Sequence, residues 1–519
     1  MRTVTAPTDH VVVVGAGLAG LAAALYLRGS GRRVTVLERD IDPGGRVGVF
    51  RGPDYEADSG ATVLTMPALI TDALAAVGAA GAAFSTSLRF VRVEPGYHAR
   101  FADGRHLDVY ADRDAMIAEV QRVCGAEQAR RYVDLRRWLG DVFDAEYERF
   151  MASNVDSPLD LVATAPARRD LARLVRLGGF GRLGRRVAHF VTDPDLARVF
   201  TFQALYAGMA PAQALGVYAA IPHMDTSLGV YFPVGGMRAI ARSMADALRA
   251  AGGVVETNTD VDRIEYAGRR ATRVCARDGR RFDCDALVLT VDLGQWCDFD
   301  VPAPKVRASP SAVVALGTIP TRVSAAWPDA HHTIDFGAAW TATFADILGG
   351  RLMRDPSLLI TRPARTDPGL LIERADGGSG ACAATRKQSH EPLSVLAPCP
   401  NLDTAALTWP TLGPAYLREV LGVLEHRGYV GIREHFTVDR LDTPQTWRDR
   451  GMLAGSPFSA AHLFRQTGPF RAPNLVRTRD NVVLAGCGTV PGVGVPTVLL
   501  SGRLAAARIT GEAGRAHTR

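Results

Sequence analysis

One stretch of sequence decides the fold: His10-Val11-Val12-Val13-Val14-Gly15-Ala16-Gly17-Leu18-Ala19-Gly20, followed by a second apolar run at Val34-Thr35-Val36-Leu37-Glu38. A run of strand length meets Gly-x-Gly-x-x-Gly, and a helix rich in alanine and leucine separates it from the second run. Gly15 allows a tight turn, Gly17 lets a pyrophosphate approach the positive end of the helix, and Gly20 lets helix pack on strand. The pattern predicts a β-α-β unit that binds a nucleotide.

The same glycine spacing occurs again at Gly179-Phe180-Gly181-Arg182-Leu183-Gly184. Leucines at helical spacing, interleaved with arginines, precede this second copy, so no strand leads into it. We therefore reject it as a nucleotide site, because the motif has meaning only between a strand and a helix. The first copy also has an acid, Glu38, 23 residues after Gly15, where a carboxylate can accept hydrogen bonds from an adenosine ribose.

Length and composition indicate a globular protein of two or three lobes. The chain has 519 residues, of which 47% are apolar and 22% charged. The chain has 60 Lys and Arg residues against 54 Asp and Glu residues, and Lys305 and Lys387 are the only lysines. This arginine usage is typical of a biased genome rather than of a nucleic-acid surface, so we expect no nucleic-acid partner. A basic surface facing anionic lipid remains open.

The cysteines favour a reducing compartment. They are odd in number, scattered, and without a Cys-x-x-Cys pair, which argues against a disulfide framework and structural zinc, and we expect no metal site. The apolar segment 11–27 is explained by the nucleotide unit rather than by a signal peptide. We expect a cytoplasmic protein without a cleaved leader. The seven cysteines are Cys124, Cys275, Cys284, Cys297, Cys382, Cys399 and Cys487.

Two further glycine turns extend the nucleotide site. Pro43-Gly44-Gly45-Arg46 presents an arginine near the expected pyrophosphate, and this turn resembles those of FAD-binding flavoproteins of the glutathione-reductase and amine-oxidase groups. At Asn481–Gly488 a strand enters a second glycine turn, and the helix start after it suits the pyrimidine edge of a flavin. The predicted FAD-binding residues are Gly15, Ala16, Gly17, Gly20, Glu38, Arg39, Gly45, Arg46, Gly60, Ala61, Thr62, Val261, Gly486, Gly488, Gly494, Val495 and Pro496.

The middle of the chain is mainly helical and contains two unusual segments. Residues 168–186 contain seven arginines and one acid among leucines, which fits either a basic amphipathic surface on a membrane or an ordinary solvated helix. Residues 199–224 contain no Asp, Glu, Lys or Arg. Pro211 and Pro222 interrupt this second segment, so we expect buried helices lining a cavity, or a shallow dip into the bilayer, rather than a transmembrane span.

Several stretches together resemble the bacterial-type phytoene desaturases, FAD-dependent enzymes of carotenoid biosynthesis, and especially actinobacterial members. The resemblance covers nearly the whole chain and is most specific near the C-terminus, where Gly486 to Pro496 is similar to the family's closing glycine-proline pattern. The chain departs from the family at Ala61, Cys487, Val490 and Thr497. The supporting stretches are the first glycine motif and residues 58–65, 231–237, 331–337, 394–400 and 481–496.

This resemblance implies desaturation of phytoene stepwise towards lycopene, with hydride transfer to the flavin. The implied substrate is a long, charge-free isoprenoid, which raises the expectation of a monotopic membrane surface near residues 165–224. With no second credible nucleotide motif for NAD(P)H, oxygen or a quinone is the expected electron acceptor. Few polar catalytic residues are needed. Asp160 matches an acid of some relatives, but Ala163 stands where they have arginine, so its role is doubtful.

Three alternatives stay open. The chain can act on another carotenoid, either desaturating a hydroxylated carotene or oxidising terminal methyl groups. It can be a generic amine oxidase, although residues 486–497 offer neither the aromatic nor the lysine expected at the flavin face. It can also be a non-catalytic carrier of prenyl lipids on the same scaffold.

The predicted fold is α/β. It combines a Rossmann-like FAD-binding domain of the glutathione-reductase and amine-oxidase type with a mixed-sheet substrate domain and a helical subdomain facing the membrane. We interpret His331 and His332 as sheet residues near a cavity rather than metal ligands, and Cys487 as a small residue packed beside the cofactor. The expected ranges are 1–88, 229–299 and 441–519 for FAD binding, 89–111 and 300–440 for the substrate sheet, and 112–228 for the helices.

Overall fold

Strands from distant parts of the chain form one parallel sheet. The computed structural model describes residues 1–5, 7–375 and 387–511. The strands of this sheet are β1 (His10–Val14), β2 (Arg33–Leu37), β9 (Val254–Glu256), β13 (Ala286–Leu289) and β20 (Val482–Leu484). They run parallel in the order β20-β13-β1-β2-β9. Parallel sheets are covered on both faces, which explains the unbroken valine run in β1.

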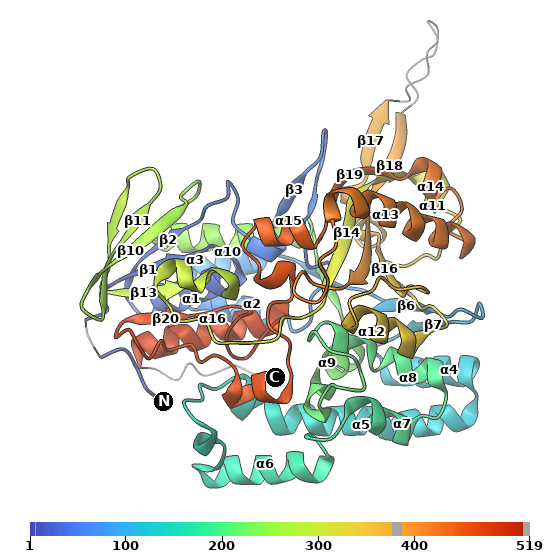
Figure 1. Ribbon diagram of the computed structural model, residues 1–519, viewed down its shortest axis with the longest axis horizontal. Helices are drawn as coiled ribbons and strands as arrows, with labels where there is room; N and C mark the ends of the chain where they lie inside the picture. Colours follow the sequence, from blue (N-terminus) through green and yellow to red (C-terminus); the bar gives the residue numbers. More distant parts are fainter. Residues whose placement is uncertain (6, 376–386, 512–519) are drawn as a thin grey trace, which may run out of the picture.

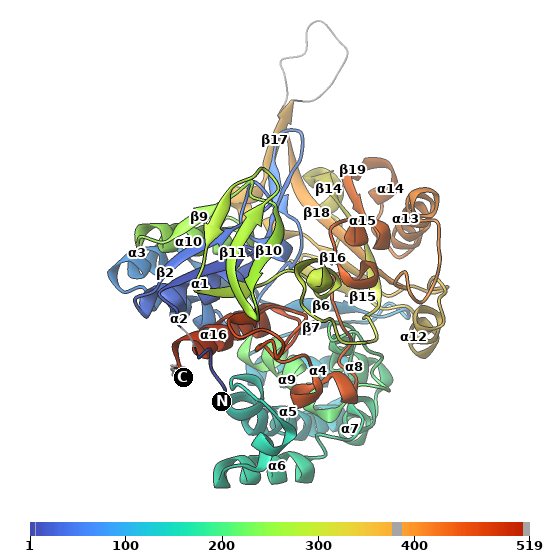
Figure 2. The same ribbon diagram turned by 60° about the vertical axis from the view of Figure 1, so that its left-hand side comes forward.

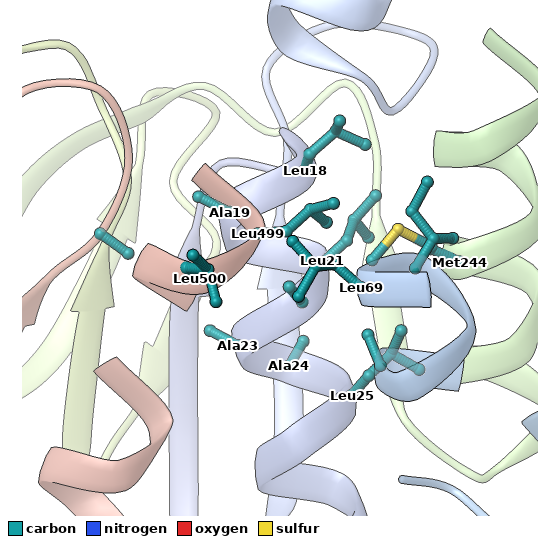
Figure 3. Packing of buried hydrophobic residues seen from close by; sticks show 14 of the residues in the cluster. Leu18, Ala19, Leu21, Ala23, Ala24, Leu25, Leu69, Met244, Leu499 and Leu500 are labelled. Atoms are coloured by element: carbon teal, nitrogen blue, oxygen red, sulfur yellow. The ribbon is translucent and has the colours of Figure 1, made fainter. Parts of the chain in front are cut away.

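Helices and a second small sheet cover the two faces. These elements are α1 (Leu18–Gly29), α2 (Ala68–Ala75), α3 (Ala79–Ser87), α10 (Arg238–Ala250), α16 (Val495–Thr510), β10 (Val261–Ala267), β11 (Arg270–Ala276) and β12 (Arg281–Asp283). Val11 and Val13 pack in one core with side chains of α1, α2, α10 and α16. Figure 3 shows part of this core, with Leu21 of α1, Leu69 of α2, Met244 of α10 and Leu499 of α16. Val12 and Val14 point the other way, into a core shared with β10 and β11. The sheet is thus closed to water on both faces.

Helices α1 and α16 approach closely because glycines lie at their contacts. A Cβ atom on Gly502 of α16 would lie 2.3 Å from the carbonyl oxygen of Ala19 in α1. A Cβ atom on Gly20 would lie 2.1 Å from the carbonyl oxygen of Gly15. Any side chain at either position would force the backbones apart. The predicted packing role of Gly20 is therefore confirmed, and Gly502 plays a similar role between the helices.

A larger mixed sheet forms the second lobe. Its strands are β6 (Tyr97–Arg100), β7 (His106–Val109), β14 (Ser311–Pro320), β15 (His332–Asp335), β16 (Leu358–Thr361), β17 (Ile372–Ala375), β18 (Lys387–Cys399) and β19 (Thr437–Asp442). The order is β19-β14-β18-β16-β15-β6-β7, with β17 paired to β18. Among the described strands of this mixed sheet, only β6 and β15 pair in parallel.

Helix α13 packs its apolar side chains into a core with this mixed sheet. The helices of this lobe are α11 (Thr321–Ser324), α12 (Trp340–Leu348), α13 (Trp409–His426), α14 (Ile432–His435) and α15 (Pro444–Asp449). Two short pairs complete the strands: β3 (Val49–Arg51) with β4 (Glu56–Asp58), and β5 (Phe90–Arg92) with β8 (Tyr231–Pro233).

The middle of the chain forms a helical region below both sheets in Figures 1 and 2, with α6 at its outer margin. Its helices are α4 (Arg113–Cys124), α5 (Ala126–Glu146), α6 (Ala165–Leu177), α7 (Leu183–Phe190), α8 (Pro194–Val199) and α9 (Ala220–His223). Within the described ranges, no helix has the length and apolar character needed to cross a bilayer. The rejected glycine motif lies between α6 and α7, with no strand before it.

Residues 199–224 differ from the expected run of buried helices. The segment forms short helical turns at Phe202–Leu205 and Gly216–Ala219 and the four-residue α9. Gly208 adopts a positive φ of 72°, and Pro211 lacks the amide that a continuing helix needs. Most side chains of the segment are buried, as predicted, but its backbone is broken into turns.

The strands sort along the ranges predicted from sequence. All strands of the parallel sheet fall in residues 1–88, 229–299 and 441–519, and the mixed sheet falls in 89–111 and 300–440 except for the end of β19. The helices of the middle region fall in 112–228. The division into three domains itself stays a prediction.

The contact between α1 and α16 generates a stability test. We expect Gly502→Ala to lower the free energy of unfolding by about 1–3 kcal/mol, because the new methyl group meets the Ala19 carbonyl. Gly422→Ala in α13 is the control, since a Cβ atom there meets nothing within 4 Å. That change should stabilise by about 0.5–1 kcal/mol. Thermal denaturation measures both, and equal shifts would contradict this account of the helix contact.

Candidate functional site

The three glycines of the first motif have different surroundings. Gly15 turns the chain with a φ of 101°, and Gly20 lies against the backbone of that turn. A Cβ atom on Gly17 would meet nothing within 4 Å, and Gly17 lines a cavity of about 1340 Å³. The open space in front of Gly17 is where the sequence predicts a pyrophosphate, at the start of α1.

Glu38 is held at the end of β2 by backbone donors. Its two carboxylate oxygens accept hydrogen bonds from the amides of Ala16 at 2.7 Å and Asp40 at 3.0 Å. Burial raises the pKa of Glu38, and the two amide bonds oppose that shift. Glu38 lines the cavity, and each carboxylate oxygen can accept a further hydrogen bond, as binding of a ribose hydroxyl requires.

Arg46 lies beside the glycine motif with part of its donor capacity unused. The strand-like bridge between Gly17 and Gly44 brings the second turn onto the first, and Gly45 would place a Cβ atom 3.3 Å from the Cα atom of Gly17. The guanidinium of Arg46 donates through Nη2 to Asp292. Its buried Nε has no hydrogen-bond partner among the described residues. The residue thus offers an unused donor in the cavity wall.

The predicted FAD-binding residue Thr62 connects the cavity to the histidine pair. Thr62 lines the cavity, and its Oγ1 lies 3.1 Å from Nε2 of His332. Burial lowers the pKa of His332 to about 3 and that of His331 to about 4. His331 contacts Thr366 through Nδ1 at 2.8 Å. Both rings are neutral near pH 7. His332 begins β15 and lines the cavity, as interpreted from the sequence, whereas His331 precedes the strand and is not among the lining residues.

The C-terminal turn closes the cavity from the other side. Gly486 and Gly494 adopt positive φ values of 112° and 123° between β20 and α16. The amide of Gly486 donates to Oγ of Ser501. Pro496 lies in the first turn of α16, where the missing proline amide costs no helix hydrogen bond. The N-terminal end of α16 therefore opens into the same cavity as the N-terminal end of α1.

The structure brings most of the predicted FAD-binding residues to this cavity. Ala16 and Gly20 do not line it: Ala16 orients Glu38 and Gly20 packs behind the turn. For every residue of the predicted set, contact with the cofactor stays a prediction. The residues that do line the cavity are Gly15, Gly17, Glu38, Arg39, Gly45, Arg46, Gly60, Ala61, Thr62, Val261, Gly486, Gly488, Gly494, Val495 and Pro496.

Asp160 lies away from the cavity lining. Its carboxylate accepts hydrogen bonds from the amides of Asp156 at 2.6 Å and Ser157 at 3.1 Å, in the capping box of a short helical turn. These bonds lower the pKa of Asp160, with the Asp156 amide as the largest cause. The doubt that the sequence raised about an acid-base role agrees with this structural position.

Sequence reasoning missed several buried polar side chains around the cavity. Asp292 follows β13 and pairs with Arg46, a position that the strand pattern could have suggested. Glu146 and Asp225 lie in helical segments without any motif, and both line the cavity. Burial raises the pKa of Asp225 to about 7 and that of Glu146 well above its usual value. No local signal in the sequence marks either acid.

The chain is similar to flavin-dependent proteins over most of its length. A family model described as flavin-containing amine oxidoreductase matches residues 18–330 and 416–510. A phytoene dehydrogenase from Streptomyces griseus is 52% identical over 98% of this chain and 97% of the relative. An all-trans-zeta-carotene desaturase from Myxococcus xanthus is 30% identical over 98% of this chain and 94% of the relative.

Solved structures share the fold at low sequence identity. Wild-type putrescine oxidase bound to putrescine matches with a TM-score of 0.59 at 14% identity, over 98% of this chain and all of the other. An oxidoreductase from Methanosarcina mazei matches with a TM-score of 0.58 at 15% identity, over 95% of this chain and 98% of the other. The predicted α/β fold of the FAD-dependent oxidoreductases is therefore confirmed, whereas the membrane-facing role of its helical region stays a prediction.

The open space at Gly17 generates a binding test. We expect Gly17→Val to raise the dissociation constant for FAD at least about tenfold, because the isopropyl group fills the space predicted for the pyrophosphate. The flavin-free protein should fold unchanged, since a Cβ atom there meets nothing within 4 Å and Gly17 has an ordinary φ of −70°. Titration of flavin-free protein with FAD measures the first effect and thermal denaturation the second. Gly422→Val is the control, and undiminished FAD affinity in Gly17→Val would contradict the placement.

Proposed function

The chain belongs to the flavin-containing amine oxidoreductase family, and on that premise we propose that it is an FAD-dependent desaturase that converts phytoene stepwise towards lycopene. The similarity to phytoene dehydrogenase supports the reaction. One structural observation carries the proposal: the residues of the nucleotide motif and many apolar side chains of the helical region and the mixed sheet line one and the same cavity.

The residues present fit FAD. The unpartnered Nε of Arg46 offers a donor to an anion, and Glu38 offers acceptors. Gly17 leaves open space at the start of α1, and Gly494 leaves the start of α16 accessible. We propose that the first pair of turns holds the adenosine and pyrophosphate groups and that the loop from 486 to 496 holds the isoalloxazine ring.

When bound, FAD supplies a hydride acceptor for the removal of two hydrogens from a carbon–carbon bond flanked by alkenes. The chain's own side chains hold the polyene and exclude water. His332 adds no charge to the chamber, because burial keeps its ring neutral and its Nε2 hydrogen-bonds with Oγ1 of Thr62. Apolar side chains from the helical region and the mixed sheet form the walls, including Phe202, Leu205, Ile221, Leu316, Leu359 and Leu396.

We propose that the cavity opens onto a membrane surface. Several side chains line the cavity and are also exposed on the outside, among them Val175 at 60% exposure and Phe464 at 51%. Phe180 and Phe470 share both properties, and the rings of Phe464 and Phe470 lie 5.6 Å apart. We name these four residues the mouth patch. Exposed aromatic and aliphatic side chains at a cavity entrance suit an apolar substrate that leaves a bilayer.

Arginines around the mouth patch favour a bilayer with anionic headgroups. Helix α6 carries the segment rich in arginine and lies at the outer margin of the molecule in both views (Figures 1 and 2). Thr164 caps its N-terminus and Gly178 ends it, so the helix is well defined. Arg173 pairs with Asp141, whereas Arg169, Arg176 and Arg185 are exposed. We therefore propose peripheral association of a cytoplasmic protein through this face.

One observation favours a second candidate, a carotene with a hydroxyl group. Asp225, Tyr97 and Tyr206 line the otherwise apolar chamber. Beside them, Gln203 is fully buried and donates to the Tyr97 hydroxyl at 3.3 Å, but its Oε1 has no hydrogen-bond partner among the described residues. A pure hydrocarbon would offer the Asp225 carboxyl no hydrogen bond, at a cost of about 1–3 kcal/mol. A hydroxyl at one end of the polyene could pair with Asp225.

Product analysis tests both candidates. In cells that make only phytoene, the protein should convert it to products with longer conjugated systems and visible absorbance. In vitro, turnover should need an oxidant, supplied in separate arms as oxygen and as a quinone. Asp225→Leu should keep phytoene turnover and lose at least about tenfold on a hydroxylated carotene, since one polar contact is removed.

The outcomes separate the candidates. Unchanged phytoene with a folded, FAD-loaded protein would refute the first proposal. Equal loss of turnover on both substrates in Asp225→Leu would refute the second, with Asp225→Asn as the variant that keeps hydrogen bonding. Purified protein that neither contains nor acquires flavin would instead favour the prenyl-lipid carrier.

Vesicle binding tests the membrane proposal. We expect Val175→Asp combined with Phe180→Asp to reduce co-sedimentation with vesicles of phosphatidylglycerol and phosphatidylcholine at least about fivefold, because a charge resists transfer into the interface. Added salt should weaken binding of the parent by screening its arginines. Val430→Asp is the control, because Val430 is 65% exposed but does not line the cavity. The same loss in the control would contradict the mouth patch as the docking face.

A further inference from the structure

Arg471 is a buried cation without an acidic partner. Its side chain belongs to a residue only 4% exposed, and no carboxylate lies within ion-pair distance of it among the described residues. Its guanidinium donates to backbone carbonyl oxygens alone, those of Ala460, Gln466, Cys487 and Thr489. A buried charge without a counter-charge is costly, so its presence calls for a function.

The neighbours of Arg471 do not cancel its charge. Burial lowers the pKa of Arg471, but a guanidinium begins so far above neutral pH that it stays charged. His462 is neutral because burial holds its pKa well below the usual value. The Tyr218 hydroxyl shares a hydrogen bond of 2.6 Å with Thr467, and burial raises the pKa of Tyr218. The net charge around the guanidinium is therefore positive.

This charge lies directly behind the C-terminal glycine loop. Nη2 donates to the carbonyl oxygen of Cys487, and Nε donates to that of Thr489 at 3.0 Å. A trans peptide points its amide hydrogen away from its carbonyl oxygen, so the amide of Gly488 points away from Arg471. Gly488 lines the cavity, and no backbone hydrogen bond from its amide to a described residue is present.

The guanidinium therefore acts on the Gly488 amide through the peptide group that joins Cys487 to Gly488. A cation bound to a carbonyl oxygen polarises that peptide and strengthens the donor on its far side. In a site that excludes water, such a donor is worth more than in solution. The arrangement presents partial positive charge to whatever lies in the cavity in front of Gly488.

We propose that Arg471 is the counter-charge for the flavin: it acts through the Cys487–Gly488 peptide to favour the negatively charged, two-electron-reduced ring of bound FAD. The balance is simple, because a neutral oxidised ring that accepts a hydride becomes a monoanion. Arg471 is thus a positioning residue that raises the reduction potential of FAD. The proposal rests on the FAD site and not on the carotenoid.

The test measures the two-electron reduction potential of the purified holoenzyme by spectroelectrochemical titration without any carotenoid. Arg471→Met should lower this potential by about 30 mV or more, which corresponds to a tenfold change in the equilibrium. Arg471→Lys should stay closer to the parent than Arg471→Gln, because lysine keeps the charge and glutamine keeps only hydrogen bonding.

Arg503→Met is the matched control. Arg503 is also buried, but it donates to the carbonyl oxygen of Ala152 and does not touch the loop at 487–489. Its loss should leave the potential unchanged. Equal potentials in the lysine and glutamine variants would overturn the proposal, and so would loss of FAD from both, because that result marks Arg471 as a structural clamp. If the variants show the predicted potentials but the parent does not turn over phytoene, only the proposed substrate is refuted.

Discussion

The close packing of α1 on α16 is the contact on which the site depends. Gly502 allows the helix that follows β20 to lie against the carbonyl of Ala19. Both helices begin at the same edge of the parallel sheet, α1 after the glycine turn that follows β1 and α16 after the loop 485–494 that follows β20. Because the two helices start close together, their free amides and positive ends face one cavity. A bulky residue in this contact would separate the two halves of the nucleotide site before it affected any side chain that lines it.

The sequence predicted the parts of the site that are local. Gly15, Gly17 and Gly20 lie within one strand-turn-helix unit. Spacing alone predicts which glycine forms the turn, which leaves space for the pyrophosphate and which allows close packing of the helix. The rejected copy at 179–184 has the same spacing without the strand, and it forms a link between two helices. The C-terminal loop was recognisable because a strand, a glycine turn and a helix follow each other again.

The parts that the sequence did not reveal depend on contacts between distant residues. The role proposed for Arg471 depends on the carbonyl oxygens of Cys487 and Thr489. The role proposed for Asp225 depends on a chamber that several elements build. A lone charged residue in a helix or loop has no spacing that predicts burial. The pattern also predicted more regular helix in residues 199–224 than the structure has. The apolar character of this segment was recognisable, but not how strongly Gly208 and Pro211 break its backbone.

The order of strands in the parallel sheet also has a consequence for synthesis on the ribosome. Strand β1 ends at residue 14, and its second neighbour β20 begins at residue 482, with β13 between them. At about 5–20 residues per second, the first strand waits on the order of half a minute or more for the last one. Strand β1 gains its neighbour β13 earlier, but until β20 emerges the outer edge of β13 lacks its native partner. A chaperone that holds this early segment would therefore protect the chain until the final helix emerges.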